Sequence, residues 1–109
     1  MPLVPDESYM KNLSPIEIVV LELLVSGGEM YGLEMVRKSS RIKRGTIYVT
    51  LDRMTDKGLV KSRREKKPGD SGLPRRIYDL TGLGARALQA HHAFQAVMTG
   101  PLAPEGSAA

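Results

Sequence analysis

Basic side chains crowd one short stretch of the chain, on both sides of a loop of turn-forming residues. Residues 61–76 carry seven Lys or Arg side chains and two acidic ones, a net charge of +5 in a chain whose total is +4. A positive patch on a nearly neutral body suits the phosphates of a nucleic acid. Six of these side chains flank the loop at residues 68–72 and are candidate phosphate contacts: Arg63, Arg64, Lys66, Lys67, Arg75 and Arg76.

A helix with chemically useful side chains precedes this stretch and begins near Gly45-Thr46-Ile47-Tyr48. Ile47, Leu51 and Met54 recur at i, i+4 and i+7, which predicts the buried stripe of a helix from about Arg44 to Lys57. In a major groove, Arg donates two hydrogen bonds to guanine, and Thr or Val methyl groups contact thymine. The tyrosine hydroxyl can reach a phosphate. The candidate contacts are Arg44, Thr46, Tyr48, Val49, Thr50 and Arg53.

Two further helices are predicted before this one. Ser14-Pro15-Ile16-Glu17 has the pattern of a capping box with proline at the first helical position, and Gly27-Gly28 ends that helix. The helix is almost wholly apolar, and its second stripe, Ile18, Leu21 and Val25, is predicted to be covered by a partner subunit. A short second helix is expected from Tyr31 to Lys38.

The period changes to that of strands after Gly58. Residues 59–64 and 75–80 read as two strands of a β-hairpin around the loop. Because strand neighbours point to opposite faces, only about half of the hairpin's basic side chains can face one ligand.

A final helix is expected from Gly82 to Met98, capped by Thr81. Arg86 is its only charged residue, which indicates an interface. The predicted contact stripe is Leu83, Ala87, Ala90, Phe94 and Val97.

The order of these elements predicts the fold class. Three helices, a hairpin and a last helix make a mainly α protein with a two-stranded β-wing, that is, a winged helix-turn-helix domain plus a C-terminal dimerisation helix. We expect an N-terminal arm at 1–12, the winged helix-turn-helix domain at 13–81, the dimerisation helix at 82–98 and a flexible tail at 99–109.

Several other chemistries are not expected. The chain has no cysteine, which excludes disulfides and thiolate metal sites. His91 and His92 are adjacent and diverge by about 100° on a helix, so a shared metal ion is not expected. Gly82-Leu83-Gly84 lacks the third glycine of a dinucleotide fingerprint. With no nucleophile–base set, neither enzyme activity nor a cofactor is predicted.

Nothing in the sequence predicts a membrane partner. No apolar run approaches the roughly 20 residues that span a bilayer. Asp6 and Glu7 stand where a signal peptide has its apolar region. A cytoplasmic location is therefore expected.

Taken as a set, these motifs resemble the PadR-like transcriptional regulators. The resemblance covers about residues 13–81, with two departures: Val49 stands where the family usually has proline, and the connection from Lys38 to Lys43 is shorter than usual. It rests on Tyr31-Gly32, Gly45-Thr46-Ile47-Tyr48, Leu51 to Arg53, Lys57-Gly58-Leu59-Val60 and Arg75-Arg76-Ile77-Tyr78-Asp79-Leu80-Thr81.

The resemblance implies a homodimeric, repressor-like protein that dimerises through its terminal helices. It also implies that some relatives respond to small aromatic or cationic ligands at the dimer interface, which makes a small-molecule effector there a possible partner of this chain. The absence of Trp argues against an indole-stacking drug pocket. We therefore predict a sequence-specific regulator of double-stranded DNA that binds a pseudo-palindromic operator. Its paired third helices would lie about 34 Å apart.

Three alternatives stay open at this point. The basic hairpin could bind an acidic protein partner, or the chain could bind RNA or DNA without sequence preference. A ligand-sensing scaffold with incidental DNA affinity is the third.

Overall fold

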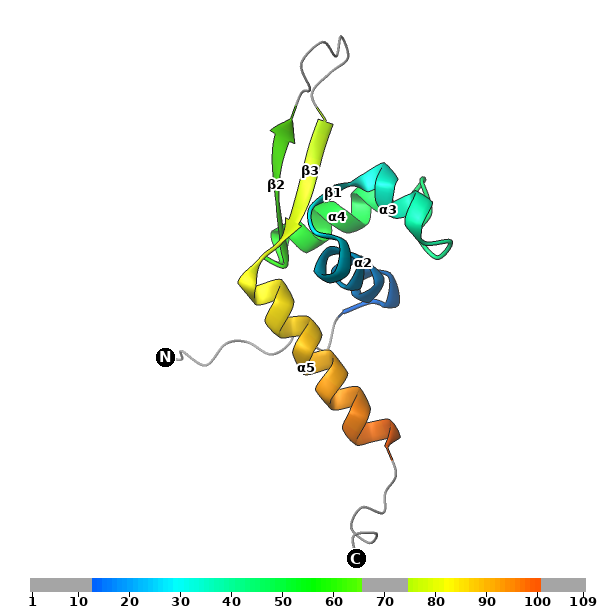
Figure 1. Cartoon of the computed structure of the whole chain (residues 1–109), viewed down its shortest axis with the longest axis vertical. Coiled ribbons are helices and arrows are strands. Elements are labelled where there is room, and N and C mark those ends of the chain that lie inside the picture. Colours follow the sequence, from blue (N-terminus) through cyan, green and yellow to red (C-terminus); the bar gives the residue numbers. More distant parts are fainter. Residues whose placement is uncertain (1–12, 66–74, 101–109) are drawn as a thin grey trace, which may run out of the picture.

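The computed structural model describes residues 13–65 and 75–100 and has the predicted order of elements, with one strand more (Figure 1). Lys66 and Lys67 lie outside the described residues. The mainly α fold with a β-wing is confirmed. The elements are α2 (Pro15–Gly27), β1 (Met30–Tyr31), α3 (Gly32–Lys38), α4 (Ile47–Asp56), β2 (Val60–Glu65), β3 (Arg75–Leu80) and α5 (Gly82–Thr99).

Helix α2 begins with the predicted capping box. The Ser14 N–H donates to Oε1 of Glu17 at 2.9 Å, and the Glu17 N–H donates to Oγ of Ser14 at 3.1 Å. The Glu17 carboxylate is 1% exposed and also pairs with Nζ of Lys57, at 3.0 and 3.1 Å from its two oxygens. Because Lys57 follows α4 directly, this ion pair holds the end of α4 against the start of α2.

The sheet has three antiparallel strands in the order β1-β3-β2. The strand that we did not predict is β1, in which Met30 pairs with Tyr78 and Tyr31 with Ile77. Two residues are too few to show a strand period, so the pattern could not reveal it. Tyr31 was predicted to open the second helix, but α3 begins one residue later, at Gly32.

The core lies between the helices and one face of the sheet. The predicted stripe of α4 is confirmed, since Ile47, Leu51 and Met54 are all 0% exposed. Helix α4 is shorter at its start than predicted, because Arg44 and Gly45 belong to a turn that precedes it. The other members of the core are Val19, Val20, Leu21, Leu24, Met30, Met35, Ile42, Leu59, Val60, Tyr78, Ala87 and Leu88.

Helix α5 begins in tight contact with the turn between α4 and β2. The Thr81 hydroxyl accepts from the Gly84 N–H at 2.9 Å and donates to the Gly58 carbonyl at 2.6 Å. A Cβ atom at Gly84 would lie 2.1 Å from the Leu59 carbonyl oxygen, so only glycine allows this approach. The rest of α5 runs away from the body of the domain (Figure 1).

The predicted dimer stripes are partly wrong. Leu21 and Ala87 are 0% exposed within the single chain, so neither can contact a partner. They were misassigned because an apolar side chain buried by its own domain gives the same pattern as one buried by a second subunit. Of the other predicted members, Val25, Phe94 and Val97 are exposed, whereas Ile18, Leu83 and Ala90 are partly buried. No helix in the described part of the chain is long and apolar enough to cross a membrane.

Candidate nucleic-acid interface

Helix α4 presents an exposed face beside the wing. Tyr48 is 44% exposed and Val49 is 59% exposed, and Arg53 lies on the same outer side. Thr46 occupies the N-cap position, where its side chain makes no capping hydrogen bond, and it is exposed. Thr50 was predicted to contact DNA, but this prediction is wrong because its side chain is only 8% exposed. It lies three residues after Ile47 and four before Met54, on the buried stripe.

The two short motifs at residues 31–32 and 45–48 meet in space. A Cβ atom built on Gly32 would lie 2.8 Å from Cε1 and 3.2 Å from the hydroxyl oxygen of Tyr48. The Tyr48 ring therefore rests on the backbone at the start of α3, where any larger residue would displace it. Glycine at this position fixes where the Tyr48 hydroxyl is held.

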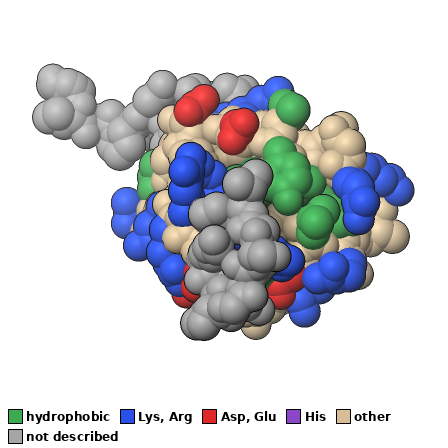
Figure 2. Space-filling view, turned by 90° about the horizontal axis from the view of Figure 1, so that it is seen from above, with side chains coloured by type: hydrophobic (Ala, Val, Ile, Leu, Met, Phe, Trp, Pro, Cys, Tyr) green, Lys and Arg blue, Asp and Glu red, His purple; other side chains and the backbone are tan. Residues whose placement is uncertain are grey.

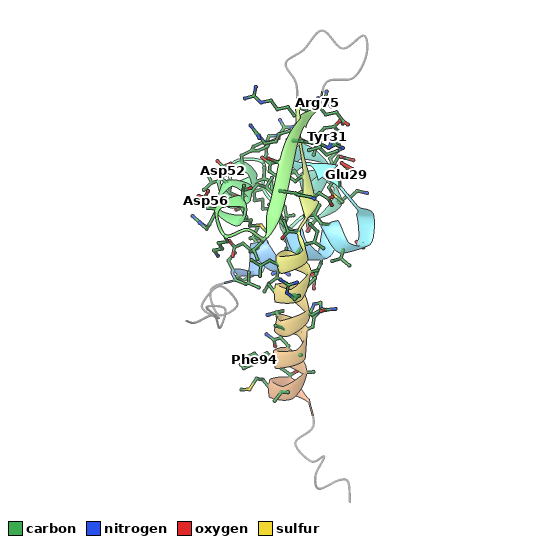
Figure 3. The ribbon with its side chains drawn as sticks, turned by 90° about the vertical axis from the view of Figure 1, so that its left-hand side faces the viewer. Glu29, Tyr31, Asp52, Asp56, Arg75 and Phe94 are labelled. Carbon is green, nitrogen blue, oxygen red and sulfur yellow. The ribbon has the colours of Figure 1, made fainter. Side chains whose placement is uncertain are left out.

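The sheet register divides the basic residues of the wing between two faces. Arg64 pairs with Arg76 on the face that also carries Val60 and Tyr78, which are in the core, so these two arginines share a side with α4. Arg63 and Arg75 belong to the opposite, outer face. Figure 3 shows the same division: Asp52 and Asp56 of α4 lie on one side of the wing strands, and Glu29 and Tyr31 on the other.

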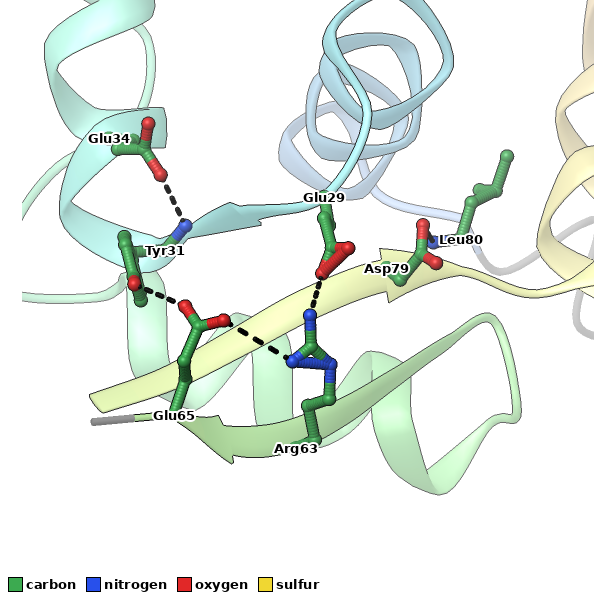
Figure 4. A network of polar contacts seen from close by, with 7 residues as sticks. All are labelled: Glu29, Tyr31, Glu34, Arg63, Glu65, Asp79 and Leu80. Carbon is green, nitrogen blue, oxygen red and sulfur yellow. Dashed lines mark hydrogen bonds and ion pairs between the residues drawn. The ribbon is translucent and has the colours of Figure 1, made fainter. Parts of the chain in front are cut away.

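Arg63 is held in a polar network on the outer face (Figure 4). Its guanidinium group pairs with Glu29 at 2.5 Å and with Glu65 at 3.5 Å. The Tyr31 hydroxyl donates to the other oxygen of Glu65 at 2.5 Å, and this bond to a carboxylate raises the pKa of Tyr31. Two carboxylates therefore pair with Arg63 on the face away from α4, while its side chain stays 54% exposed, and its contact with DNA stays a prediction.

A second basic group, of which the sequence analysis predicted only Arg44, spans the last turn of α3 and the turn before α4. Residues 37–44 contain five basic and no acidic side chains, and all five are exposed. Ile42 is 2% exposed and anchors the turn in the core, so its neighbours project outward. The run of five basic residues within eight positions is the sequence signal that could have revealed this group. The group is Arg37, Lys38, Arg41, Lys43 and Arg44.

Helix α4 itself is not basic. Between Ile47 and Asp56 it has one Arg and two Asp side chains, a net charge of −1. Asp52 and Asp56 are both exposed, and Asp52 lies close enough to Tyr78 to affect its ionisation. Burial is the main cause of the raised pKa of Tyr78, with Arg76 opposing it and Asp52 adding to it. The positive charge thus lies beside the helix, on the segment that leads into it and on the wing.

Figure 2 shows the molecule from the wing end, with the side chains coloured by type. Lys and Arg side chains are spread around this face, with exposed hydrophobic side chains between them.

Elsewhere, His92 pairs with Glu22 at 3.0 Å. The described residues contain no group of three or more His, Cys, Asp or Glu side chains that could hold a metal ion.

Three helices, of which α4 is exposed, followed by a β-wing are the architecture of a winged helix-turn-helix protein. Residues 20–90 match the Transcriptional regulator PadR-like family, and the chain belongs to this family. Its members are transcriptional regulators and not enzymes. No curated protein matches the chain.

Solved structures of family members have the same fold. One is a PadR family transcription regulator from Clostridium difficile R20291, with 28% identity, a TM-score of 0.67 and coverage of 78% of this chain and 91% of that one. A PadR-like transcription factor from Bacteroides fragilis has 24% identity, a TM-score of 0.70 and coverage of 84% and 89%. Bacillus subtilis PadR in complex with operator DNA has 24% identity and a TM-score of 0.62, over 75% of this chain and 47% of that chain.

Proposed function

We propose that this family member is a sequence-specific DNA-binding regulator that acts as a homodimeric repressor on a pseudo-palindromic operator. One observation carries the proposal: α4 is exposed beside two basic groups but is not itself basic. The basic residues at 37–44 come from the end of α3 and the turn that leads into α4, and Arg64 and Arg76 come from the face of the wing that α4 shares. Such basic groups suit the phosphates beside a groove, and leave the helix to read bases.

The exposed face of α4 offers distinct contacts to base edges. The methyl groups of Thr46 and Val49 suit the methyl group of thymine, and Arg53 can donate two hydrogen bonds to guanine. Asp52 adds a carboxylate, which can accept a hydrogen bond from the amino group of cytosine. Among the described residues, Arg53 has no carboxylate partner within ion-pair distance, so its guanidinium group is available to a base.

The dimer is supported by the far half of α5. Phe94, Val97 and Met98 are 61%, 75% and 63% exposed, and they recur at i, i+3 and i+4 on one side of the helix. Figure 3 shows Phe94 on the part of α5 that lies away from the wing. An apolar stripe of this kind favours a second copy of the same helix. Two subunits would place two α4 helices in successive major grooves, about 34 Å apart.

The repressor would act in the cytoplasm by occupying a promoter and excluding polymerase. A small-molecule effector at the dimer interface stays a prediction from the family resemblance. No described pocket singles out its chemistry.

Selection of duplexes from a random pool, followed by fluorescence titration, tests the proposal. We expect one enriched site with two related halves, bound at least about 10³-fold more tightly than bulk DNA. Arg53→Ala should relax the preference at a guanine and Asp52→Asn at a cytosine, each by a factor of about ten. Arg64→Ala should weaken binding to all duplexes equally and lower the salt dependence. Asp56→Asn, one turn beyond Asp52, serves as the control for lost negative charge.

Other outcomes would favour the other functions. An absence of duplex binding at low salt would contradict the proposal and favour an acidic protein partner. A preference of less than about tenfold over bulk DNA, or tighter binding to RNA, would favour non-specific nucleic-acid binding.

A further inference from the structure

A depression of about 400 Å³ lies at the junction of α3, the start of α4 and the edge of β3. Its wall contains three arginines from two different elements, Arg37 of α3 and Arg75 and Arg76 of β3. The rings of Tyr31 and Tyr48 also line it. The three guanidinium groups and the Tyr48 hydroxyl are hydrogen-bond donors that converge on one concave place, which suits an anion with several acceptor oxygens. The Tyr31 hydroxyl already donates to Glu65, so Tyr31 contributes its ring.

The register of the sheet explains why two consecutive arginines can line the same depression. Strand β1 pairs only with Ile77 and Tyr78, so β3 extends beyond the end of β1 at Arg75 and Arg76. Neighbouring strand residues point to opposite faces, and these two therefore flank the open edge from either side. Arg37 approaches from the last turn of α3.

The contacts of the arginines leave them able to bind an anion. The Arg75 guanidinium lies 5.6 Å from the centre of the Tyr31 ring, and Arg76 donates to the Ser62 hydroxyl at 3.1 Å. Within residues 13–65 and 75–100, no carboxylate lies within ion-pair distance of Arg37, Arg75 or Arg76.

The one acidic group in the wall is already engaged. A carboxylate oxygen of Glu34 accepts from the Tyr31 N–H at 2.8 Å, and this bond holds the acid at the start of α3. With three guanidinium groups against one carboxylate, the wall is positive. Glu65, which accepts from the Tyr31 hydroxyl and is the cross-strand partner of Arg75, adds a second carboxylate beside the wall. Three guanidinium groups against these two carboxylates still leave one positive charge in excess, which favours an anion.

We propose that this depression binds one phosphate group of the DNA backbone. Arg37 and Arg76 hold the phosphate by charge-assisted hydrogen bonds, and the Tyr48 hydroxyl, fixed by its contact with Gly32, donates a third. Arg75, stacked on Tyr31, closes the wall. The site rests on the proposed function. The DNA strand whose phosphate it binds would pass between the wing and α4, which lies in the major groove. The site sets the register of α4 on the duplex without reading a base.

Three variants of the full chain test whether this site, rather than the overall positive charge of the protein, contributes to DNA affinity. Arg37→Gln and Arg76→Gln each remove one proposed phosphate ligand, and Lys61→Gln removes an equal charge from an exposed position on the outer face of the wing. We expect each Arg variant to bind the selected duplex about tenfold more weakly and to lower the salt slope by about one per subunit. Lys61→Gln should change the affinity less than about twofold. All three side chains are exposed, and circular dichroism verifies that each variant is folded.

Duplexes with one neutral methylphosphonate at each backbone position in turn locate the phosphate. Wild-type protein should lose about tenfold in affinity at one position in each half-site. The double variant Arg37→Gln/Arg76→Gln should show no further loss at that same position, while losses elsewhere remain. A second double variant, Arg37→Lys/Arg76→Lys, keeps both positive charges but lacks the two parallel N–H donors of each guanidinium group. It should recover only part of the affinity that the double Gln variant loses.

The outcomes separate a failure of the phosphate site from a failure of the proposed function. If the Arg variants match Lys61→Gln while wild-type protein binds its selected site, the phosphate site is wrong and the regulator stands. If wild-type protein binds no duplex, the proposed function is itself wrong. A third outcome would overturn the assignment to the DNA backbone. If wild-type protein binds inorganic phosphate saturably at constant ionic strength, and Arg37→Gln abolishes this binding without changing the affinity for DNA, the depression binds a free anion.

Discussion

The buried ion pair between Glu17 and Lys57 should be a main determinant of stability, and Glu17→Gln tests it. The carboxylate is 1% exposed and serves two partners, the Ser14 N–H and the Lys57 ammonium. Glutamine keeps the shape of the side chain and an oxygen for the capping bond. The substitution therefore removes the negative charge and little else.

The structure sets the magnitude of the effect. Removing one partner of a fully buried pair costs about 3–5 kcal/mol. The Lys57 side chain is 22% exposed, so water can partly hydrate the ammonium group, and the amide oxygen of glutamine still accepts hydrogen bonds. We therefore expect a loss of about 1–3 kcal/mol in the free energy of unfolding. For a chain of this size that corresponds to a fall of about 5–15 °C in Tm.

Thermal unfolding at one fixed protein concentration measures the loss, with Glu22→Gln as the matched control. Glu22 is on the same helix and pairs with His92, but both side chains are about half exposed, at 49% and 54%. An exposed pair of this kind contributes less than about 0.5 kcal/mol. If Glu17→Gln and Glu22→Gln unfold at the same temperature, the reasoning from burial is refuted.

Three further predictions concern the interface, the dimer and the pH dependence of stability. Gly32→Ala should displace the Tyr48 ring and weaken DNA binding about tenfold, whereas Gly82→Ala, which meets only a flexible side chain, should bind like wild type in the same titration. Phe94→Glu should convert the dimer to a monomer in sedimentation at micromolar concentration, and a persistent dimer would exclude the α5 stripe as the interface. Burial raises the pKa of Tyr78, so the folded chain holds this proton at a pH where the unfolded chain has lost it. Stability should therefore fall as the pH rises from the ordinary tyrosine pKa through the raised one, and Tyr78→Phe should lack this component of alkaline unfolding while other groups still titrate.

The local elements were predictable because their signals are local. The capping box at Ser14, the i, i+4, i+7 stripe of α4 and the helix cap at Thr81 each depend on residues within a few positions of one another. Helical period and hydrogen-bond capping act over the same short range. The sequence by itself thus determined the order of helices and wing, and with it the class of protein.

Tertiary structure alone decided which side chains share a surface. Strand register, set by pairs as distant as Tyr31 and Ile77, placed Arg64 with α4 and turned Arg63 towards Glu29 and Glu65. The same packing formed the arginine-lined depression from residues that are far apart along the chain. Composition shows how much charge is present, but the direction of each side chain follows from long-range pairing, which no local pattern encodes.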